Sequence, residues 1–312
     1  MEYTAIEEIC EGYGARHERE APLAPHTSMR IGGNADLLVC PNCEQAACDI
    51  LSECRRSGIA YFILGRGSNV LFGGDGYRGC VILIGSDMAG ISVSGCTLTA
   101  GAGAALSAVC GAALEHGLCG MEFAYGIPGS IGGALCMNAG AYGGEMKDVV
   151  SSCRCIDESG RIIEMSAEDM CLRYRGSVFS ERSLCILSVT LTLSLGDRAQ
   201  IKARMEELLC CRRAKQPLEY PSCGSTFKRP KGYFAAALIE ECGLKGCTIG
   251  GAQVSEKHSG FVINKGGATF EDVTELVRHI KATVMEQKGV ELECEMIIVC
   301  GGGVTPLSNR GQ

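Results

Sequence analysis

Hydrophobic positions along the chain follow two periodicities, which predicts a mixture of helices and strands. Apolar residues recur at helical spacing over 44–57 and 269–288, and a glycine follows each segment. Short apolar runs at 61–64, 80–84 and 185–193 lie near glycine, serine or aspartate turns and predict strands. Further helices are expected over 1–21, 104–116, 199–215 and 234–242, and further strands over 37–40, 70–72, 91–94, 97–100, 149–156, 162–165 and 296–300.

The order of these elements predicts an α+β protein with two domains. Residues 1–26 form an N-terminal helix and extension. A first domain covers 27–196. From Gly79 onward the predicted strands are short and are separated by glycine or aspartate turns, and this change divides the domain into subdomains of 27–78 and 79–196. A charged helix that ends before Pro217 leads into a second domain, 197–312, whose C-terminal tail is a candidate to pack back on the first subdomain.

Composition is that of a cytoplasmic globular protein. The 312 residues are 46% hydrophobic and 21% charged, and the net charge is −7. No basic tract is present, so neither nucleic acid nor an anionic membrane is expected as a partner. No apolar run approaches the ~20 residues of a membrane span, and the acidic first residues do not resemble a signal peptide.

Cysteine is abundant, with 21 residues scattered through predicted helices and strands. Two pairs raise the question of a metal site: Cys40 with Cys43, and Cys210 with Cys211. A zinc or iron–sulfur site needs two such pairs at motif spacing, and no partner stands near Cys40 and Cys43. We expect reduced cysteines that act as small apolar residues, and no bound metal.

The stretch from Gly126 to Glu145 holds the main chemical signal. Seven of its twenty residues are glycine, and most of the rest are small or apolar. Glycine weakens a helix or strand interior, so this density does not predict either. It lets bare backbone lie against a flat ligand with N–H groups turned toward it. A glycine-rich turn between sheets is the alternative, and it stays open at this point.

A second glycine turn, Gly65-Arg66-Gly67-Ser68-Asn69, follows a predicted strand. Consecutive N–H groups in such a turn can hold phosphate oxygens, although an ordinary hairpin turn explains the turn alone equally well. It is neither the dinucleotide fingerprint nor a P-loop. This turn and the Gly126–Glu145 stretch together suggest a ligand with a diphosphate and a flat ring. Gly101-Ala102-Gly103 is a candidate third segment to contact that ligand.

Several motifs resemble the UDP-N-acetylenolpyruvoylglucosamine reductase family, in its shorter (type II) subtype. They occur in the family's order over about residues 25 to 301. The resemblance implies an FAD-binding domain of the vanillyl-alcohol-oxidase (PCMH) type in two subdomains, followed by an α+β substrate-binding domain. The matching segments are 26–28, 30–33, 65–71, 126–143, 174–177, 224–228, 258–264 and 292–295.

The resemblance also implies a set of binding residues. Arg229 stands where the longer subtype often has asparagine, which leaves a substrate contact at this position in doubt. The substrate contacts would include Tyr174, Lys228 and His258, with a structural role as an equal alternative for His258. The FAD contacts would fall on Gly65, Gly67, Ser68, Asn69, Leu71, Ile127, Gly129, Ser130, Gly132, Asn138 and Gly140.

The implied activity is the NADPH-driven, FAD-dependent reduction of the enolpyruvyl ether of a UDP-sugar, by a protein expected to be a monomer. The hydride passes from flavin N5 to C3 of the enolpyruvyl group, and negative charge then develops as an enolate. By resemblance, Arg175 and Glu295 stabilise this charge and Ser225 donates a proton to C2. To donate a hydrogen bond, Glu295 must be protonated, which requires a raised pKa.

Three other functions compete with this interpretation. Pro128 to Gly132 comes near the nucleophile elbow of a serine hydrolase, but a proline stands at the first glycine position. A related flavin oxidase and a nucleotide-sugar-binding module without activity are the others. A flavin spectrum would exclude the hydrolase, and bleaching of that spectrum by NADPH would exclude the binding module.

Overall fold

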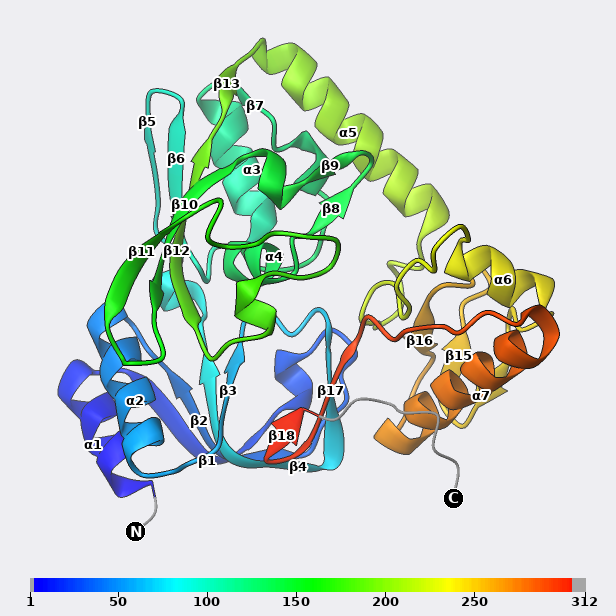
Figure 1. The fold of residues 1–312 in the computed structure, drawn as a ribbon, viewed down its shortest axis with the longest axis horizontal. Coiled ribbons are helices and arrows are strands. Elements are labelled where there is room, and N and C mark those ends of the chain that lie inside the picture. The colour runs from blue at the N-terminus through cyan, green and yellow to red at the C-terminus, as the bar shows by residue number, and fades with distance from the viewer. Residues whose placement is uncertain (1–2, 305–312) are drawn as a thin grey trace. The chain divides into compact units, whose positions relative to one another are not determined.

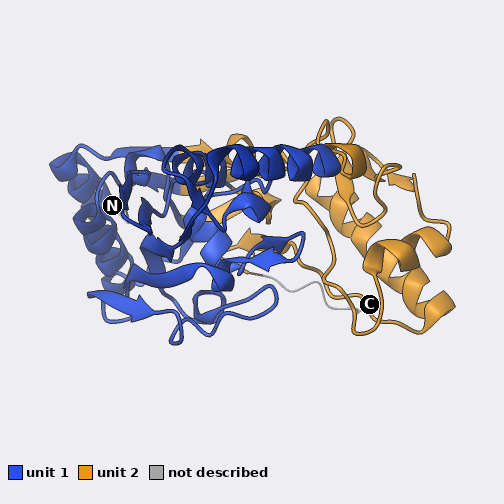
Figure 2. Ribbon diagram, turned by 90° about the horizontal axis from the view of Figure 1, so that it is seen from above, with its two compact units in different colours: residues 1–19, 37–66, 80–212 blue, residues 20–36, 67–79, 213–312 orange. Residues whose placement is uncertain are grey.

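The computed structural model describes residues 3–304, and the chain divides into two compact units. Unit 1 comprises residues 1–19, 37–66 and 80–212, and unit 2 comprises residues 20–36, 67–79 and 213–312 (Figure 2). The domain edges expected from the sequence stay predictions. The expected packing of the C-terminal tail involves residues 305–312, which lie outside the described residues.

Unit 1 contains an antiparallel five-stranded sheet with the order β11-β10-β12-β6-β5 (Figure 1). Its register pairs Cys153 with Val189 and Val189 with Ala100, and all three side chains are buried in one core. Helices α3 and α4 pack on the sheet. These strands are β5 (Ile91–Ser94), β6 (Thr97–Gly101), β10 (Val150–Ile156), β11 (Ile162–Ser166) and β12 (Cys185–Thr192).

Three helices of unit 1 follow the predicted spacing closely, namely those predicted over 44–57, 104–116 and 199–215. In α2, the Cys43 thiol accepts a hydrogen bond from the Ala46 N–H and caps the first turn. Its apolar face, including Ile50 and Leu51, is buried in the core. The helices are α1 (Thr4–Tyr13), α2 (Glu44–Arg56), α3 (Leu106–Glu115), α4 (Ile131–Cys136) and α5 (Arg198–Lys215), which reaches into unit 2.

Unit 2 is organised by its long helix α7 (Phe270–Lys288), which packs on a three-stranded sheet. Thr269 and Asp272 form a capping box: the Thr269 hydroxyl accepts from the Asp272 N–H, and the Asp272 carboxylate accepts from the Thr269 N–H. Gly289, with φ +65°, ends the helix. The other elements are α6 (Ala235–Glu241), β14 (Thr248–Ile249), β15 (Ala252–Val254) and β16 (Val262–Asn264).

A six-stranded sheet corrects two sequence-based expectations. The predicted helix over 1–21 ends at Gly14, and β1 (Arg16–Pro22) follows as a polar edge strand beside β2 (Asn34–Cys40). The strand β4 (Val70–Leu83) continues where the sequence predicted a break at Gly79. Strand pairing is a tertiary contact, so local pattern did not reveal either feature.

Pairing along β4 involves a different partner in each unit. In unit 1, β3 (Tyr61–Leu64) pairs in parallel with Cys80 to Leu83. In unit 2, β17 (Ile297–Gly301) pairs in parallel with Val70 to Phe72, and β18 (Gly303–Val304) pairs with β17. The remaining short strands are β7 (Leu118–Cys119), β8 (Gly140–Ala141), β9 (Gly144–Glu145) and β13 (Ser194–Leu195).

Candidate active site

The glycine-rich stretch of unit 1 contains a short helix, which the sequence analysis did not expect. Ser130 caps α4, because its hydroxyl accepts a hydrogen bond from the Gly133 N–H at 3.3 Å. A Cβ added to Gly132 would lie 2.8 Å from the Ala102 Cβ. Glycine is therefore tolerated inside this helix because it allows another segment to approach closely.

The three glycine segments of unit 1 meet at the start of α4. Gly132 N–H donates to Ala102 O at 3.0 Å, which joins the 101–103 segment to the helix. A Cβ on Gly65 would lie 2.7 Å from the Ser130 Oγ, so the end of the first turn lies against the same place. Gly65, the 101–103 segment and the start of α4 therefore lie together within unit 1, and a ligand at these segments stays a prediction.

Asn138 lies just after α4 and holds three segments together. Its side chain is fully buried and its φ is +41°. The side-chain amide donates to the Glu145 carboxylate at 2.7 Å and to Arg173 O at 3.2 Å, and it accepts from the Lys147 N–H at 2.9 Å. The Asn138 side chain is thus engaged inside unit 1. Because the whole residue is buried, a coenzyme contact at Asn138 stays a prediction.

Arg175, the predicted enolate-stabilising cation, is held beside the glycine-rich stretch. Its guanidinium donates to Gly140 O at 3.4 Å and lies 5.2 Å from the centre of the Tyr174 ring. The backbone of Arg175 has φ +53°, which is uncommon for a long side chain and marks a constrained position. Tyr174 is 54% exposed. Unit 1 therefore brings Arg175 together with Gly140.

In unit 2 the remainder of the first glycine turn packs on residues 26–28. Gly67 has φ +59°, and a Cβ there would collide with His26 O. The Ser28 N–H donates to Gly67 O at 3.0 Å, and the Ser28 hydroxyl donates to Ser222 O at 2.6 Å. The His26–Ser28 motif thus connects the turn to the segment that carries Ser225.

Ser225 and Glu295 lie in neighbouring segments of unit 2 that an isolated β-bridge joins. The Glu295 N–H donates to the carbonyl of Thr226 at 2.8 Å, and Phe227 pairs with Cys294 as an antiparallel bridge. Thr226 is 2% exposed and also accepts from the Val262 N–H at its hydroxyl. The structure therefore brings these two predicted catalytic residues together within unit 2.

His258 supports the Ser225 segment through main-chain bonds. Its Nδ1 accepts from the Gly260 N–H at 3.1 Å, and Gly260 O accepts from the Thr226 N–H at 2.8 Å. Its ring meets the Phe261 ring edge-on at 5.0 Å. Burial lowers the pKa of His258, so the neutral form is favoured. The sequence left His258 open between binding and a structural role, and the two-residue turn that shows the structural role is not visible in the sequence.

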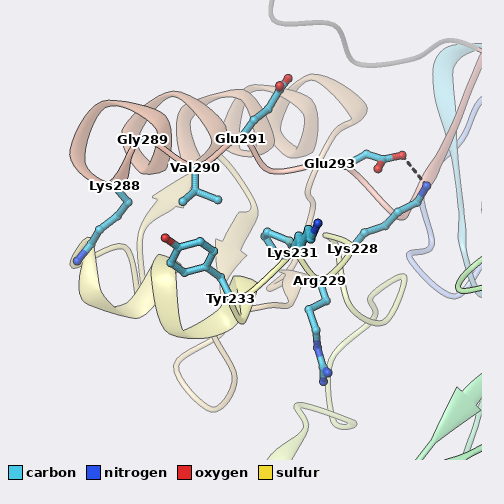
Figure 3. A pocket seen from close by; sticks show the side chains of 10 residues that line it. Lys228, Arg229, Lys231, Tyr233, Lys288, Gly289, Val290, Glu291 and Glu293 are labelled. Atoms are coloured by element: carbon cyan, nitrogen blue, oxygen red, sulfur yellow. Dashed lines mark hydrogen bonds and ion pairs between the residues drawn. The ribbon is translucent and has the colours of Figure 1, made fainter.

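Lys228 lines a pocket of about 480 Å³ in unit 2 (Figure 3). Its ammonium pairs with the Glu293 carboxylate at 2.5 Å, and the Lys288 ammonium pairs with Glu241 at 2.7 Å. Four basic and two acidic residues face this pocket, so its local charge is positive although the chain is acidic overall. The lining residues are Lys228, Arg229, Pro230, Lys231, Tyr233, Lys288, Gly289, Val290, Glu291 and Glu293.

The predicted FAD contacts differ in how open they are. The partly exposed ones can meet a ligand with several atoms, and the buried ones are covered by the protein's own atoms. Leu71, for example, belongs to the core of unit 2. The partly exposed group is Gly65, Ser68, Asn69, Ile127, Gly129 and Gly140. The buried group is Gly67, Leu71, Ser130, Gly132 and Asn138.

The cysteines are free thiols, and most of them are buried or partly buried. Burial raises the pKa of Cys110, Cys185 and Cys223 to about 12, so these thiols stay protonated at neutral pH. Over residues 3–304, no group of three or more His, Cys, Asp or Glu side chains is arranged to hold a metal ion. In the same range, no helix combines the length and apolar character that crossing a membrane requires.

Comparisons with known proteins agree with this architecture. Residues 35–166 match the family described as FAD binding domain, and residues 216–299 match the C-terminal domain of UDP-N-acetylenolpyruvoylglucosamine reductase. The reductase of that name from Clostridium perfringens (strain SM101) is 49% identical over 280 residues, which are 90% of this chain and 92% of the relative. That from Caldanaerobacter subterraneus is 49% identical over 278 residues, which are 89% of this chain and 92% of the relative.

A solved structure extends the agreement to three dimensions. The UDP-N-acetylenolpyruvylglucosamine reductase from Thermus caldophilus superposes with a TM-score of 0.77 at 32% identity, covering 91% of this chain and 98% of that one. The α+β fold and the flavin domain define an FAD-dependent oxidoreductase with a PCMH-type coenzyme domain. Within that class, the chain belongs to the UDP-N-acetylenolpyruvoylglucosamine reductase family.

Membership of this family removes one competing interpretation. Ser130, the would-be nucleophile of a hydrolase, is 2% exposed and caps a helix. A nucleophilic serine must be open to its substrate and paired with a base. The hydrolase interpretation is therefore wrong.

Proposed function

We propose that this protein reduces UDP-N-acetyl-enolpyruvoylglucosamine to UDP-N-acetylmuramate, with bound FAD and with NADPH as the hydride donor. The close similarity to curated reductases over nine-tenths of the chain supports the substrate and the reaction. The observation that carries the proposal at the level of residues is the main-chain bond between Glu295 and the Ser225 segment. This bond joins the main chain of Glu295 to the segment that carries Ser225 and supports the assignment of both residues to one site.

The residues present fit the coenzyme. In unit 1, Gly65 packs against Ser130 and Gly132 packs against Ala102. The partly exposed Gly65, Gly129 and Gly140 leave main chain open to a ligand. We propose that these segments, with the Gly67–Leu71 segment of unit 2, hold FAD. When bound, FAD supplies the hydride that reduces the enolpyruvyl group.

The proposed roles of the chain's own side chains follow from where charge develops. Electron density builds on the enolpyruvyl carboxylate as the double bond is reduced, so a cation and hydrogen-bond donors stabilise the transition state. Arg175 supplies the cation, and Glu295 supplies a hydrogen bond in its protonated form. Ser225 donates the proton to C2, and its poor acidity is compensated by position and by the basicity of the carbanion.

The substrate's remaining groups are assigned to the predicted binding residues. We propose that the diphosphate binds at Lys228, at the positively charged pocket of Figure 3. An anion there would compete with Glu293 for the Lys228 ammonium. Tyr174 is open enough to contact a ligand. His258 is proposed to act on the substrate side as well as through the turn that it supports.

An anaerobic spectrum tests the proposal. The purified protein should show flavin absorbance, and NADPH should bleach it. Addition of the enolpyruvyl nucleotide should restore the colour at once, whereas air should restore it slowly. A protein that air reoxidises rapidly, with no response to the nucleotide, would be an oxidase and would overturn the proposed substrate.

A further inference from the structure

Asn69 supports Glu295 in an unusual way at the end of a parallel strand pair. The ladder between β4 and β17 pairs Val70 with Ile297, and the Ile297 N–H donates to Asn69 O at 2.9 Å. In a parallel ladder the next hydrogen bond along would come from the main-chain N–H of residue 69 to the carbonyl of residue 295. Instead, the side-chain amide of Asn69 donates to Glu295 O, at 3.0 Å.

The side chain of Asn69 thus extends the ladder by one hydrogen bond beyond β17. Because the side chain supplies this bond, the main-chain N–H of Asn69 is not used in it. Glu295 is then fixed on both sides: its N–H donates to Thr226 O, and its carbonyl accepts from Asn69. All of these residues belong to unit 2. With both main-chain groups held, the direction in which the Glu295 side chain leaves the main chain is set.

We infer that Asn69 is a positioning residue for Glu295, acting through the Glu295 main chain. This inference rests on the proposed function, which gives Glu295 its role in stabilising the enolate. The inference assigns the Asn69 side chain to holding the Glu295 main chain. The predicted coenzyme contact is then made by the main chain of the same turn. The turn that is proposed to hold the coenzyme would also aim the acid at the substrate.

The test uses two variants of Asn69. Asn69→Ala removes the donor, and Asn69→Asp keeps the size but replaces the donor by an acceptor that repels Glu295 O. Oxidation of the reduced flavin by the enolpyruvyl nucleotide should slow about 10–100-fold in both, as for other residues that orient a functional group. Flavin reduction by NADPH and the FAD content per chain should stay near those of the unchanged protein. If Asn69→Ala does not fold, Asn69→Asp carries the same comparison.

A double-mutant cycle with Glu295→Gln separates positioning from a general structural effect. If Asn69 acts through Glu295, adding Asn69→Ala to Glu295→Gln should slow the nucleotide step less than about threefold further. Asn264→Ala is the matched control, because the Asn264 amide also donates to a main-chain carbonyl of unit 2, that of Met29 at 3.1 Å. Its effect on the nucleotide step should multiply with that of Glu295→Gln.

The possible outcomes are distinct. Loss of FAD and of flavin reduction in the Asn69 variants would show a coenzyme contact and overturn the inference. If the fold-decreases in the nucleotide step caused by the Asn69 and Glu295 substitutions multiply fully in the double variant, the inference is also overturned. The proposed function then still stands. A Glu295→Gln protein with an unchanged nucleotide step would remove the proposed role of Glu295, and the inference would fall with it.

Discussion

The two units stabilise their parts of the site by different means. In unit 1, glycine removes side chains so that three segments lie against one another at the start of α4, as Gly132 and Ala102 show. In unit 2, the Asn69 amide donates to Glu295 O and the Glu295 N–H donates to Thr226 O, and these bonds hold the main chain around Glu295. A substitution in the first region should therefore act by steric clash on the coenzyme. One in the second should act by loss of alignment on the substrate step.

Gly132→Ala should have the largest effect of the changes that sharpen this comparison. The added Cβ would lie 2.8 Å from that of Ala102, so the segments must separate. We expect loss of most bound FAD, measured by absorbance per chain after purification.

Gly111→Ala is the control within the same unit. It lies in α3, and a Cβ there would meet no atom within 4 Å. Alanine at that position should keep the flavin and raise stability slightly, since glycine weakens a helix by about 0.5–1 kcal/mol. Equal colour in the two variants would contradict the steric account of unit 1.

Arg175→Gln and Glu295→Gln should have the next largest effect. Each removes a group proposed to stabilise developing charge, at a cost of roughly 3 kcal/mol, or on the order of a hundredfold in the nucleotide step. Arg173→Gln is the control, because its guanidinium pairs with the exposed Glu181 and such pairs contribute little. Turnover that is unchanged in the first two variants would discard these roles.

The smallest expected effect is the pH dependence of stability that His258 causes. Burial lowers its pKa below the ordinary 6.5, so the folded protein binds fewer protons there than the unfolded chain. The contribution of neutral His258 to the free energy of unfolding is therefore fully present above about pH 6.5. It is lost as the pH falls below that value. His258→Asn keeps an acceptor for the Gly260 N–H and removes the titration.

The variant should lose less melting temperature than the unchanged protein between about pH 7.5 and 5.5. An identical loss in both proteins would mean that folding does not lower the pKa of His258.

Local pattern was sufficient for much of the fold and for only part of the site. The capped, periodic helix α7 begins and ends almost where the sequence predicted, because its caps and apolar face are local features. The edge strand β1 was predicted as helix, since only its partner β2 makes it a strand. The sequence did not predict helix α4, because the close approach of Ala102, which requires glycine at position 132, is a contact between distant parts of the chain.

The same limit applies to the site residues. Family motifs identified Asn69, Asn138 and Glu295 as functional, but the hydrogen bonds of their side chains and main chain depend on tertiary neighbours. Asn138 binds Glu145 and Arg173, and Asn69 binds Glu295, 226 positions away. A motif therefore predicts where a residue matters and does not reveal which atoms it uses.

Separate recording of the two half-reactions of Ser225→Ala by rapid mixing tests the central claim most directly. The account predicts that NADPH reduces the flavin at nearly the normal rate, because Ser225 lies in unit 2 and has no proposed part in that step. Oxidation by the enolpyruvyl nucleotide should slow by at least about 10²–10⁴-fold, the usual contribution of a positioned proton donor. Equal slowing of both half-reactions, or of neither, would contradict the assignment of Ser225 as that donor.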